Sequence, residues 1–299
     1  MKNTKLILAF LLFILFNFSA FSQQFYLTGN MNYSIGMNGQ KGWLSNYTRE
    51  SVFDPANGID HYSSSDEEVP LSLGKGFDLG VGVGYMFNDK IGVEIDLNYL
   101  IGAEVKSSSK SKRTSIYNNN VRVSDDYSNY DVSMKMWRVM PSLVLRPGFE
   151  KFNPFLKMGV VLGFGEMNWN ELRVTKETNT GGTTEDKWGS KTVYSGGMSF
   201  GFHSALGVDF SLSEKLSLTT EVSYIGLSFV PKKAVVVERT QNGKDLLPDM
   251  EKYYIETEFV KKITVENTNT PNLDEPSKTL RISFPASSIG FKIGLKFNL

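Results

Sequence analysis

The residues best suited to acid–base or nucleophilic chemistry are few, because the chain has two histidines and no cysteine. His61 lies in the segment HYSSSDEE, where His61, Ser63 and Asp66 supply the residue types of a hydrolytic triad. Neighbours in a polar loop rarely reach triad geometry, so we predict a flexible loop and no catalytic site. His203 lies among small residues, and we predict a hydrogen bond for it rather than catalysis.

Acidic residues of the same region carry the oxygen ligands that calcium prefers. These residues are Asp54, Asp60, Asp66, Glu67 and Glu68. They lack a recognised ligand spacing, and without cysteine no thiolate site can form. Glycines at 80, 82 and 84 resemble a phosphate-binding loop, but no helix start follows them. We therefore expect no metal site and no cofactor.

A second set of ionisable residues recurs at alternate positions of segments that are otherwise apolar or small. It comprises Asp78, Glu94, Asp96, Glu104, Arg138, Arg146, Lys157, His203, Asp209, Glu221, Lys292 and Lys296. Both signs of charge occur, which predicts an ion-pair network rather than a ring of one sign. Buried charges are tolerated only when they are paired. We expect these residues to fill and hold an enclosed interior, and a conducting role is the alternative.

The elements that must position these residues are strands, most clearly the last eleven residues, 289–299. Their sequence, IGFKIGLKFNL, places apolar residues at every odd position and small or polar residues at every even one. Strict alternation indicates a β-strand whose two faces differ. At a tilt of about 40°, ten steps cover about 26 Å, which matches the apolar band of an outer-membrane barrel. The length therefore favours a membrane strand.

Seven further segments show the same alternation. The eight predicted strands span about 24–37, 76–87, 91–102, 132–146, 154–166, 192–212, 216–230 and 289–299. Pro141 predicts a local irregularity because it cannot donate to the ladder. The strand at 216–230 is the weakest, and we expect its phase to slip near Gly226. Short turns alternate with long polar connections at about 38–71, 106–131, 168–191 and 231–279, as in outer-membrane barrels.

The composition of the polar faces indicates which side is enclosed. Alternation by itself also fits a soluble sandwich or a lipocalin-like barrel. Glycine and serine dominate these faces, however, and glycine weakens a solvent-exposed strand whereas it makes room inside a narrow barrel. We predict an all-β, eight-stranded antiparallel transmembrane β-barrel with long extracellular loops. Aromatic residues near the strand ends fit interfacial girdles: Tyr85, Phe87, Tyr99, Trp137 and Phe297.

The longest connection leaves a ten-strand alternative open. Within 231–279, the segments 234–239 and 253–265 carry alternating charges around an Asn242-Gly243 turn. We interpret them as a hairpin standing clear of the bilayer, because glutamates and lysines occupy both faces. Counting this hairpin in the barrel would give ten strands.

The N-terminus has the features of a secretory signal. Lys2 and Lys5 precede an apolar run, and the small residues Ala20 and Ser22 suit a signal peptidase. We predict a cleaved signal peptide over 1–22 and one outer-membrane barrel domain over 23–299; an uncleaved helical anchor is the alternative. Without Lys2 and Lys5, 30 basic residues face 32 acidic ones, a near balance that gives no reason to expect nucleic acid as a partner.

On these patterns the chain resembles the small outer-membrane β-barrel proteins of Gram-negative bacteria, the OmpA/OmpX-like porin superfamily. The resemblance covers residues 24–299, and Phe297 stands near the end where the family's terminal strand carries an aromatic residue. It implies contact with outer-membrane lipid and with the barrel assembly machinery. We expect a structural or surface-interaction role through the long loops, with an unidentified extracellular partner. A narrow pore for small solutes is the alternative, and a lipid-modifying hydrolase ranks last.

Overall fold

The computed structural model describes residues 25–37, 44–117, 120–263 and 271–299. These residues form a sheet of seventeen strands, nearly all of them antiparallel to their neighbours. Two short helices, η2 (Leu247–Asp249) and α2 (Lys252–Ile255), accompany the sheet. Neither they nor any other helix of the described segments is long and apolar enough to cross a membrane. The predicted signal peptide, residues 1–22, lies outside the described residues.

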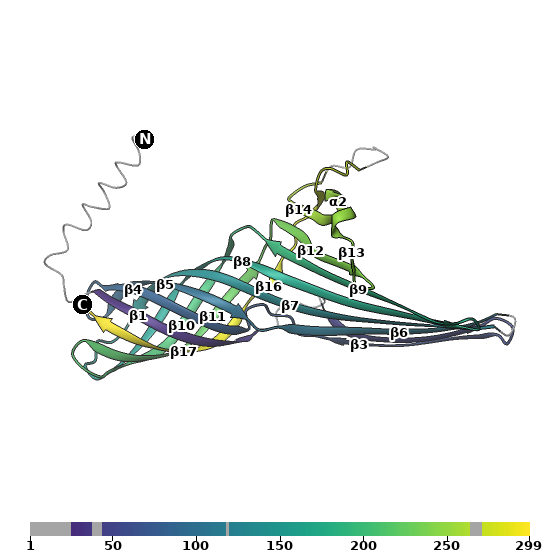
Figure 1. The fold of residues 1–299 in the computed structure, drawn as a ribbon. Helices are drawn as coiled ribbons and strands as arrows, with labels where there is room; N and C mark the ends of the chain where they lie inside the picture. The colour runs from purple at the N-terminus through teal and green to yellow at the C-terminus, as the bar shows by residue number, and fades with distance from the viewer. Residues whose placement is uncertain (1–24, 38–43, 118–119, 264–270) are drawn as a thin grey trace.

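Eight strands close into a ring in which every pairing is antiparallel. In ring order they are β1 (Phe25–Gly36), β4 (Gly76–Met86), β5 (Ile91–Gly102), β7 (Asn120–Leu145), β8 (Phe152–Asn179), β10 (Ser199–Ser211), β11 (Leu216–Phe229) and β17 (Ser288–Asn298). Figure 1 shows the ring at the left, with the C-terminus at its outer end. Each of the eight predicted segments contributes one of these strands.

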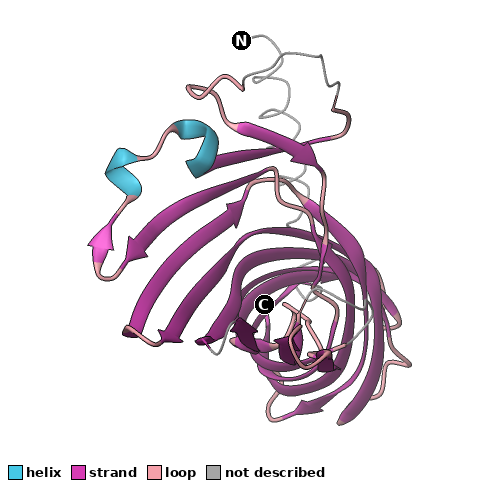
Figure 2. Ribbon diagram, turned by 90° about the vertical axis from the view of Figure 1, so that its right-hand side faces the viewer, coloured by secondary structure: helices cyan, strands magenta, loops and turns pink. Residues whose placement is uncertain are grey.

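The remaining strands form an open sheet that continues from one end of the ring, here called the extension. It contains β2 (Ser45–Asp54), β3 (Ile59–Glu68), β6 (Val105–Tyr117), β9 (Gly182–Ser195), β12 (Lys233–Gln241), β13 (Lys244–Asp245), β14 (Glu256–Val260) and β15 (Ser277–Leu280). The outer halves of β7 and β8 run through its middle. Figure 2 shows the extension opening to one side of the closed ring.

The long connections were predicted as loops, and this prediction is wrong for most of their described length. Within them, residues 45–54, 59–68, 105–117, 120–131, 168–179 and 182–191 lie in paired strands. Their threonine, tyrosine and valine residues favour strands, but both faces of the extension are polar. The sequence therefore lacks the apolar–polar alternation that reveals a half-buried strand.

The connection at 231–279 contains the turn that the sequence predicted. Asn242 and Gly243 both adopt positive φ angles, 50° and 82°, as a tight hairpin turn requires. The returning strand β13 has only two residues, and the chain then enters η2 and α2. The predicted strand over 253–265 is therefore wrong in its first part, where α2 lies, and residues 264–265 fall outside the described residues.

The two faces of the ring differ as the alternation predicts. Apolar side chains cover the outside; the exposed fraction of Val81 is 61% and that of Phe200 is 66%. The inner face is polar over most of its height. On β11 the phase does not slip near Gly226: Ile225, Leu227 and Phe229 continue the inward set begun by Glu221. The inward residues merely become apolar, because they meet an apolar cluster at that end.

Two local features follow from residue type. The β7–β8 ladder is interrupted at Met140 and Pro141 and resumes in the same register at Ser142, as expected for a residue without an amide hydrogen. Aromatic pairs lie toward both ends of the ring wall. Tyr85 packs edge-on against Phe87 beside the short turns, and Tyr99 packs against Trp137 beside the extension.

Candidate functional site

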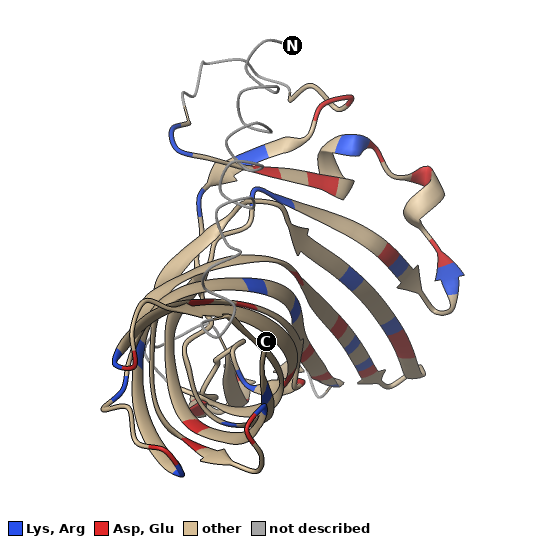
Figure 3. Ribbon diagram, turned by 90° about the vertical axis from the view of Figure 1, so that its left-hand side faces the viewer, with Lys and Arg blue, Asp and Glu red and all other residues tan. Residues whose placement is uncertain are grey.

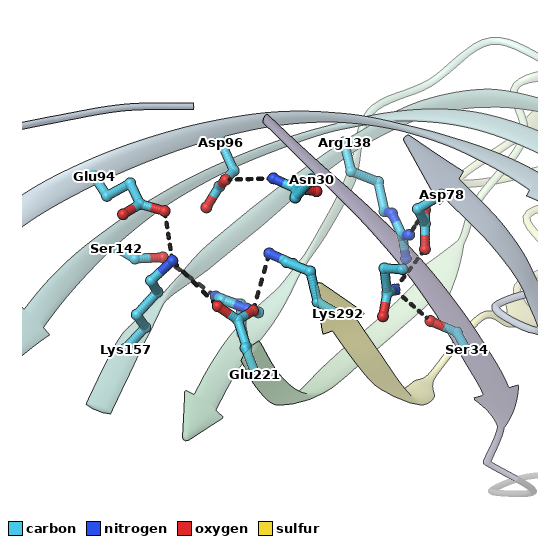
Figure 4. Close-up of polar contacts among 12 residues, drawn as sticks. Asn30, Ser34, Asp78, Glu94, Asp96, Arg138, Ser142, Lys157, Glu221 and Lys292 are labelled. Atoms are coloured by element: carbon cyan, nitrogen blue, oxygen red, sulfur yellow. Dashed lines mark hydrogen bonds and ion pairs between the residues drawn. The ribbon is translucent and has the colours of Figure 1, made fainter. Parts of the chain in front are cut away.

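The ring interior gathers most of the ionisable residues that the sequence singled out. Buried on the inner face are Asp78, Glu94, Asp96, Arg138, Lys157, His203, Asp209, Glu221, Lys292 and Lys296. They come from seven of the eight ring strands, and β1 adds Tyr26, Asn30 and Asn32. We call this set the charged layer. Figure 4 shows its side chains converging from opposite walls of the ring.

Two residues that were predicted to lie in the interior lie outside the charged layer. Arg146 follows the end of β7, where it is half-buried and donates a hydrogen bond from Nε to the carbonyl oxygen of Asp89 at 3.1 Å. Glu104 lies beyond the end of β5 and forms an exposed ion pair with Lys106, at 3.1 Å. Both residues were assigned by extrapolating the alternation past the point where the ring strand ends.

A chain of ion pairs crosses the middle of the charged layer. Lys157 Nζ lies 2.5 Å from Glu94 Oε1 and 3.2 Å from Glu221 Oε2. Lys292 Nζ lies 2.9 Å from the other carboxylate oxygen of Glu221. The phenol of Tyr26 donates to Glu94 Oε2 at 2.7 Å. Two carboxylates and two ammonium groups thus alternate, which is the condition under which charges can be buried.

Two further pairs lie on either side of this chain. Toward the extension, Arg138 forms a buried ion pair with Asp78, which also accepts a hydrogen bond from Asn32 Nδ2 at 2.8 Å. Toward the short turns, Lys296 Nζ lies 2.8 Å from Asp209 Oδ2, and Thr219 donates to the same carboxylate at 2.7 Å. The charged layer therefore has both signs at each level and no ring of one sign.

The two remaining interior residues have weaker partners. The Ser142 hydroxyl lies 3.2 Å from His203 Nδ1, so the imidazole has the hydrogen bond that was expected of it. Asp96 accepts from Asn30 Nδ2 at 3.5 Å. Among the described side chains, neither His203 nor Asp96 belongs to an ion pair of 4 Å or less.

Glycines of the inner face leave the space that these side chains occupy. A Cβ atom on Gly84 would overlap the ring of Tyr26, and one on Gly80 would overlap the amide of Asn98. Both glycines lie within the strand β4 rather than at a helix start. The row at 80, 82 and 84 therefore serves close packing inside the ring.

An apolar cluster closes the ring interior at the end that carries the extension. Its buried members include Leu71, Leu73, Leu100, Met134, Met136, Met140, Val161, Met167, Ile225, Leu227, Phe229, Phe284 and Ala286. Residue Phe284 belongs to β16 (Phe284–Pro285), which pairs with the end of β11. The backbone N–H of Leu73 donates a hydrogen bond to the carbonyl oxygen of Pro285, at 2.8 Å. We call this cluster the apolar layer. It was not predicted from the sequence, because Leu71, Leu73, Phe284 and Ala286 lie outside the predicted strands.

The opposite end of the ring is open to solvent. A pocket of about 470 Å³ lies there, lined by residues such as Arg146, Asp209, Lys215 and Lys296. The short turns of the ring surround it. The ring interior is therefore open at the short turns, filled in its middle by the charged layer and closed at the extension by the apolar layer.

The residue types of a hydrolytic triad do not converge in the first hairpin. His61, Ser63 and Asp66 all lie on the exposed edge strand β3. Because side chains alternate along a strand, His61 and Ser63 share one face while Asp66 lies on the other. In the described parts of the chain, no group of three or more histidine and acidic side chains is placed to hold a metal ion.

The extension carries a cluster of one arginine and two tyrosines that was not predicted from the sequence. The guanidinium of Arg49 lies over the rings of Tyr47 and Tyr62, at 5.4 and 5.0 Å from their centroids. Hydrogen bonds with Ser64, and then with Tyr47 and Arg49, lower the pKa of the Tyr62 phenol to about 8. The spacing Tyr47-Thr48-Arg49 was the available signal, since alternate residues of a strand share a face.

Comparison with known proteins gives one family match and a set of similar structures. The family described as outer membrane protein β-barrel domain matches residues 8–246. Neisserial surface protein A (NspA) is 12% identical, with 92% of this chain and 97% of that chain covered and a TM-score of 0.35. The outer membrane protein OprG from Pseudomonas aeruginosa is 15% identical, with 93% and 96% covered and a TM-score of 0.39. Among curated proteins, none matches the chain.

Proposed function

The chain belongs to the outer membrane protein β-barrel domain family, and from this premise we propose that it is a structural or surface-interaction protein whose ring spans the outer membrane. The ring then acts as an eight-stranded antiparallel barrel, with its apolar outside in lipid. The extension takes the part that was first assigned to extracellular loops, and it meets a partner outside the cell. Outer-membrane barrels place their short turns in the periplasm, which gives the molecule this orientation.

The observation that carries the proposal is the filled interior of the ring. The charged layer is held by ion pairs of 2.5–3.2 Å that cross from wall to wall. The apolar layer lies between it and the extension. A ring filled in this way anchors the chain and holds its strands in register. The large polar extension is then the part that is available for interaction.

The proposal also covers the beginning and end of the chain. Residues 1–22 act as a cleaved signal peptide, and residues 23–299 form the outer-membrane domain. Phe297 lies on the lipid-facing side of β17, where it is accessible to the barrel assembly machinery. The last strand pairs with β1 over eleven residues, which closes the ring.

Two other functions receive less support. A narrow pore for small solutes needs a continuous aqueous path, and the apolar layer offers no polar lining for one. A lipid-modifying hydrolase needs its nucleophile, base and acid together, whereas Asp66 lies on the opposite face of β3 from His61 and Ser63. We therefore propose that the protein is not a lipid-modifying hydrolase. Replacing His61 with alanine should leave the turnover of lipid A and phospholipid unchanged.

The experiment is amine labelling of intact cells with a membrane-impermeant reagent, combined with single-channel recording of the purified chain. We expect labelling at the exposed extension residues Lys110, Lys112 and Lys187. Lysines of the short turns, Lys90, Lys151 and Lys215, serve as matched controls and should react only after the outer membrane is opened. Labelling of the turns on intact cells would overturn the orientation, and stable open currents would overturn the filled ring.

A further inference from the structure

One face of the extension is continuous with the ring interior and carries most of the arginines. Following the pairings across β2, β6, β7, β8, β9 and β12 places five side chains on it: Arg49, Arg113, Arg122, Arg173 and Arg239. The chain has eight arginines in all. Lysines of the same strands lie on the other face, among them Lys110, Lys176 and Lys187. We call the first surface the arginine face; Figure 3 shows the charge bands that cross the extension.

A pocket of about 290 Å³ lies on the arginine face where β8, β9 and β12 run side by side. Two cross-strand rows form it. Glu171, Ser190 and Arg239 make one row, and Arg173, Trp188 and Gln241 make the next. Its lining consists of Glu171, Arg173, Trp188, Gly189, Ser190 and Arg239. Gly189 and Ser190 are the small residues of this lining, and the other four carry longer side chains.

Two charged groups that line this pocket, Glu171 and Arg239, do not form an ion pair with each other. Glu171 and Arg239 lie on strands separated by β9, so their backbones are about 10 Å apart. Within the described residues, neither belongs to an ion pair of 4 Å or less. Arg173 is partly engaged, since its Nη2 donates to Asp126 at 3.1 Å. An unpaired carboxylate, an unpaired guanidinium and an indole thus surround one space.

The structure assigns this pocket to one unit of an acidic sugar, presented by a carboxylated glycan. The guanidinium of Arg239 can hold a carboxylate through two parallel hydrogen bonds. The Trp188 indole offers a flat apolar surface and an N–H donor to the ring of the sugar. Glu171 accepts hydrogen bonds from hydroxyl groups, and Ser190 can donate or accept.

The carboxylate of Glu171 argues against a more highly charged ligand. A sulfate group has acceptor oxygens and no donor, and a phosphate group carries about −1.5 to −2 charges at neutral pH, so Glu171 would repel either of them. A carboxylated sugar has one anionic group for Arg239 and several hydroxyl donors for Glu171. The volume lies at the low end of the range for ligand pockets, which suits a single sugar unit better than a folded partner.

This inference rests on the proposed function, because the pocket reaches such a glycan only if the extension lies outside the cell. The test is isothermal titration calorimetry of the full chain in detergent micelles with an oligomer of galacturonic acid. The methyl ester of that oligomer and a neutral galactose oligomer are titrated in parallel. We expect the free acid to bind more tightly than either of them.

The matched variants lie on the two faces of the extension. Arg239→Gln and Trp188→Ala should each weaken binding of the acid by about tenfold or more, because they remove a charge-assisted contact and the stacking surface. Lys187→Gln, next to Trp188 but on the opposite face, should leave binding unchanged. The shift between boiled and unboiled samples on a gel shows that each variant is folded.

Several results would overturn the inference. They are equal binding of the acid and its ester, unchanged binding by Arg239→Gln and Trp188→Ala, or no binding by the unsubstituted chain. Equally tight binding of a glutamate-rich peptide would replace the sugar with an acidic peptide. If extension lysines still react on intact cells while galacturonate fails to bind, the sugar inference fails and the proposed function stands. If the extension lysines do not react with the reagent on intact cells, the proposed function fails together with the sugar inference.

Discussion

The ring and the extension are built from the same strands, β7 and β8, yet their side chains follow different rules. Inside the ring, β8 presents Lys157 to the interior and Met158 to the outside. In the extension the same strand presents Arg173 on one face and Lys176 on the other. A ring wall separates two environments, whereas both faces of the extension meet water. Alternation in a sequence thus reports the difference between two solvents and not the presence of a strand.

We expect that removing a charge inside the ring strongly lowers the free energy of unfolding, whereas removing a charge in the extension changes it little. Lys157→Met leaves Glu94 and Glu221 short of a partner inside the ring. Breaking a buried pair in this way should cost about 3–5 kcal/mol of the free energy of unfolding. The measurement is denaturant unfolding of the chain in micelles, followed by tryptophan fluorescence.

The matched control for Lys157→Met is Lys176→Met in the extension. Lys176 lies 2.9 Å from Glu185 with half of its side chain exposed. Water screens an exposed pair of this kind, so its loss should change the free energy of unfolding far less than the loss of Lys157. Similar losses of stability for the two variants would show that the ring interior is as hydrated as the extension.

A second difference concerns the outward faces. Ile293→Arg should cost about 2–4 kcal/mol, because the side chain lies at mid-height on the lipid-facing side of β17. Leu172→Arg, on the outward face of β8 beyond the ring, should change stability by less than about 0.5 kcal/mol. Folding yields into lipid vesicles measure both. Equal tolerance at the two positions would mean that lipid does not contact this side of the ring.

The packing of the interior predicts a third difference, which is smaller. Gly84→Val should cost about 1–3 kcal/mol, because the new side chain meets the ring of Tyr26. Gly29→Val is the control, since a Cβ atom there has no neighbour within 4 Å. Thermal unfolding in micelles compares them, and an unchanged midpoint for Gly84→Val would indicate spare room inside the ring.

The smallest expected effect is the response of the extension to acid. Partial burial opposes ionisation of Asp126, but hydrogen bonds from Thr175 and Arg173 outweigh it and lower the pKa of this carboxyl. A group with a lowered folded pKa stabilises the fold above its unfolded value, about 3.9, and loses that contribution as the pH falls through the folded value. Hydrogen-exchange protection of β7 near Asp126 should therefore fall between pH 5 and pH 3.

The control for the acid response is Asp126→Asn, which should remove the pH dependence of protection in the outer half of β7. Protection in the ring half of β7 should stay constant over the same range. A parallel loss in both halves would show that acid acts on the whole molecule rather than on this contact.

The sequence allowed the ring strands and their facing to be predicted, because lipid on one side and a crowded interior on the other impose a strict pattern. The pattern at 289–299 specifies both the strand and the direction of Lys292 and Lys296. The strands of the extension could not be found in this way. Residues 105–117, with sequence VKSSSKSKRTSIY, have no apolar face, and their pairing depends on partners that lie far away in the sequence.

The individual charged residues of the interior could be predicted from the sequence, but the apolar layer could not. Nothing in the spacing of Leu71, Leu73 and Phe284 places them at one end of the ring, because they reach it through connections rather than through ring strands. The same limit explains Arg146, whose position depends on where β7 ends. The pocket at Trp188 depends on three strands in register, and only the folded chain brings Glu171 and Arg239 to one surface.

The length of β7 and β8, which run from the ring into the extension, has a mechanical consequence. They have 26 and 28 residues, about 90 Å of extended chain. They pair from Val123 and Thr178 down to Leu145 and Leu156, with one gap in the ladder at Met140 and Pro141. A pull on the far tip therefore loads this ladder in shear, so that many hydrogen bonds resist together instead of opening one after another. With the extension outside the cell, as proposed above, tension applied to that tip would reach the ring along these two strands.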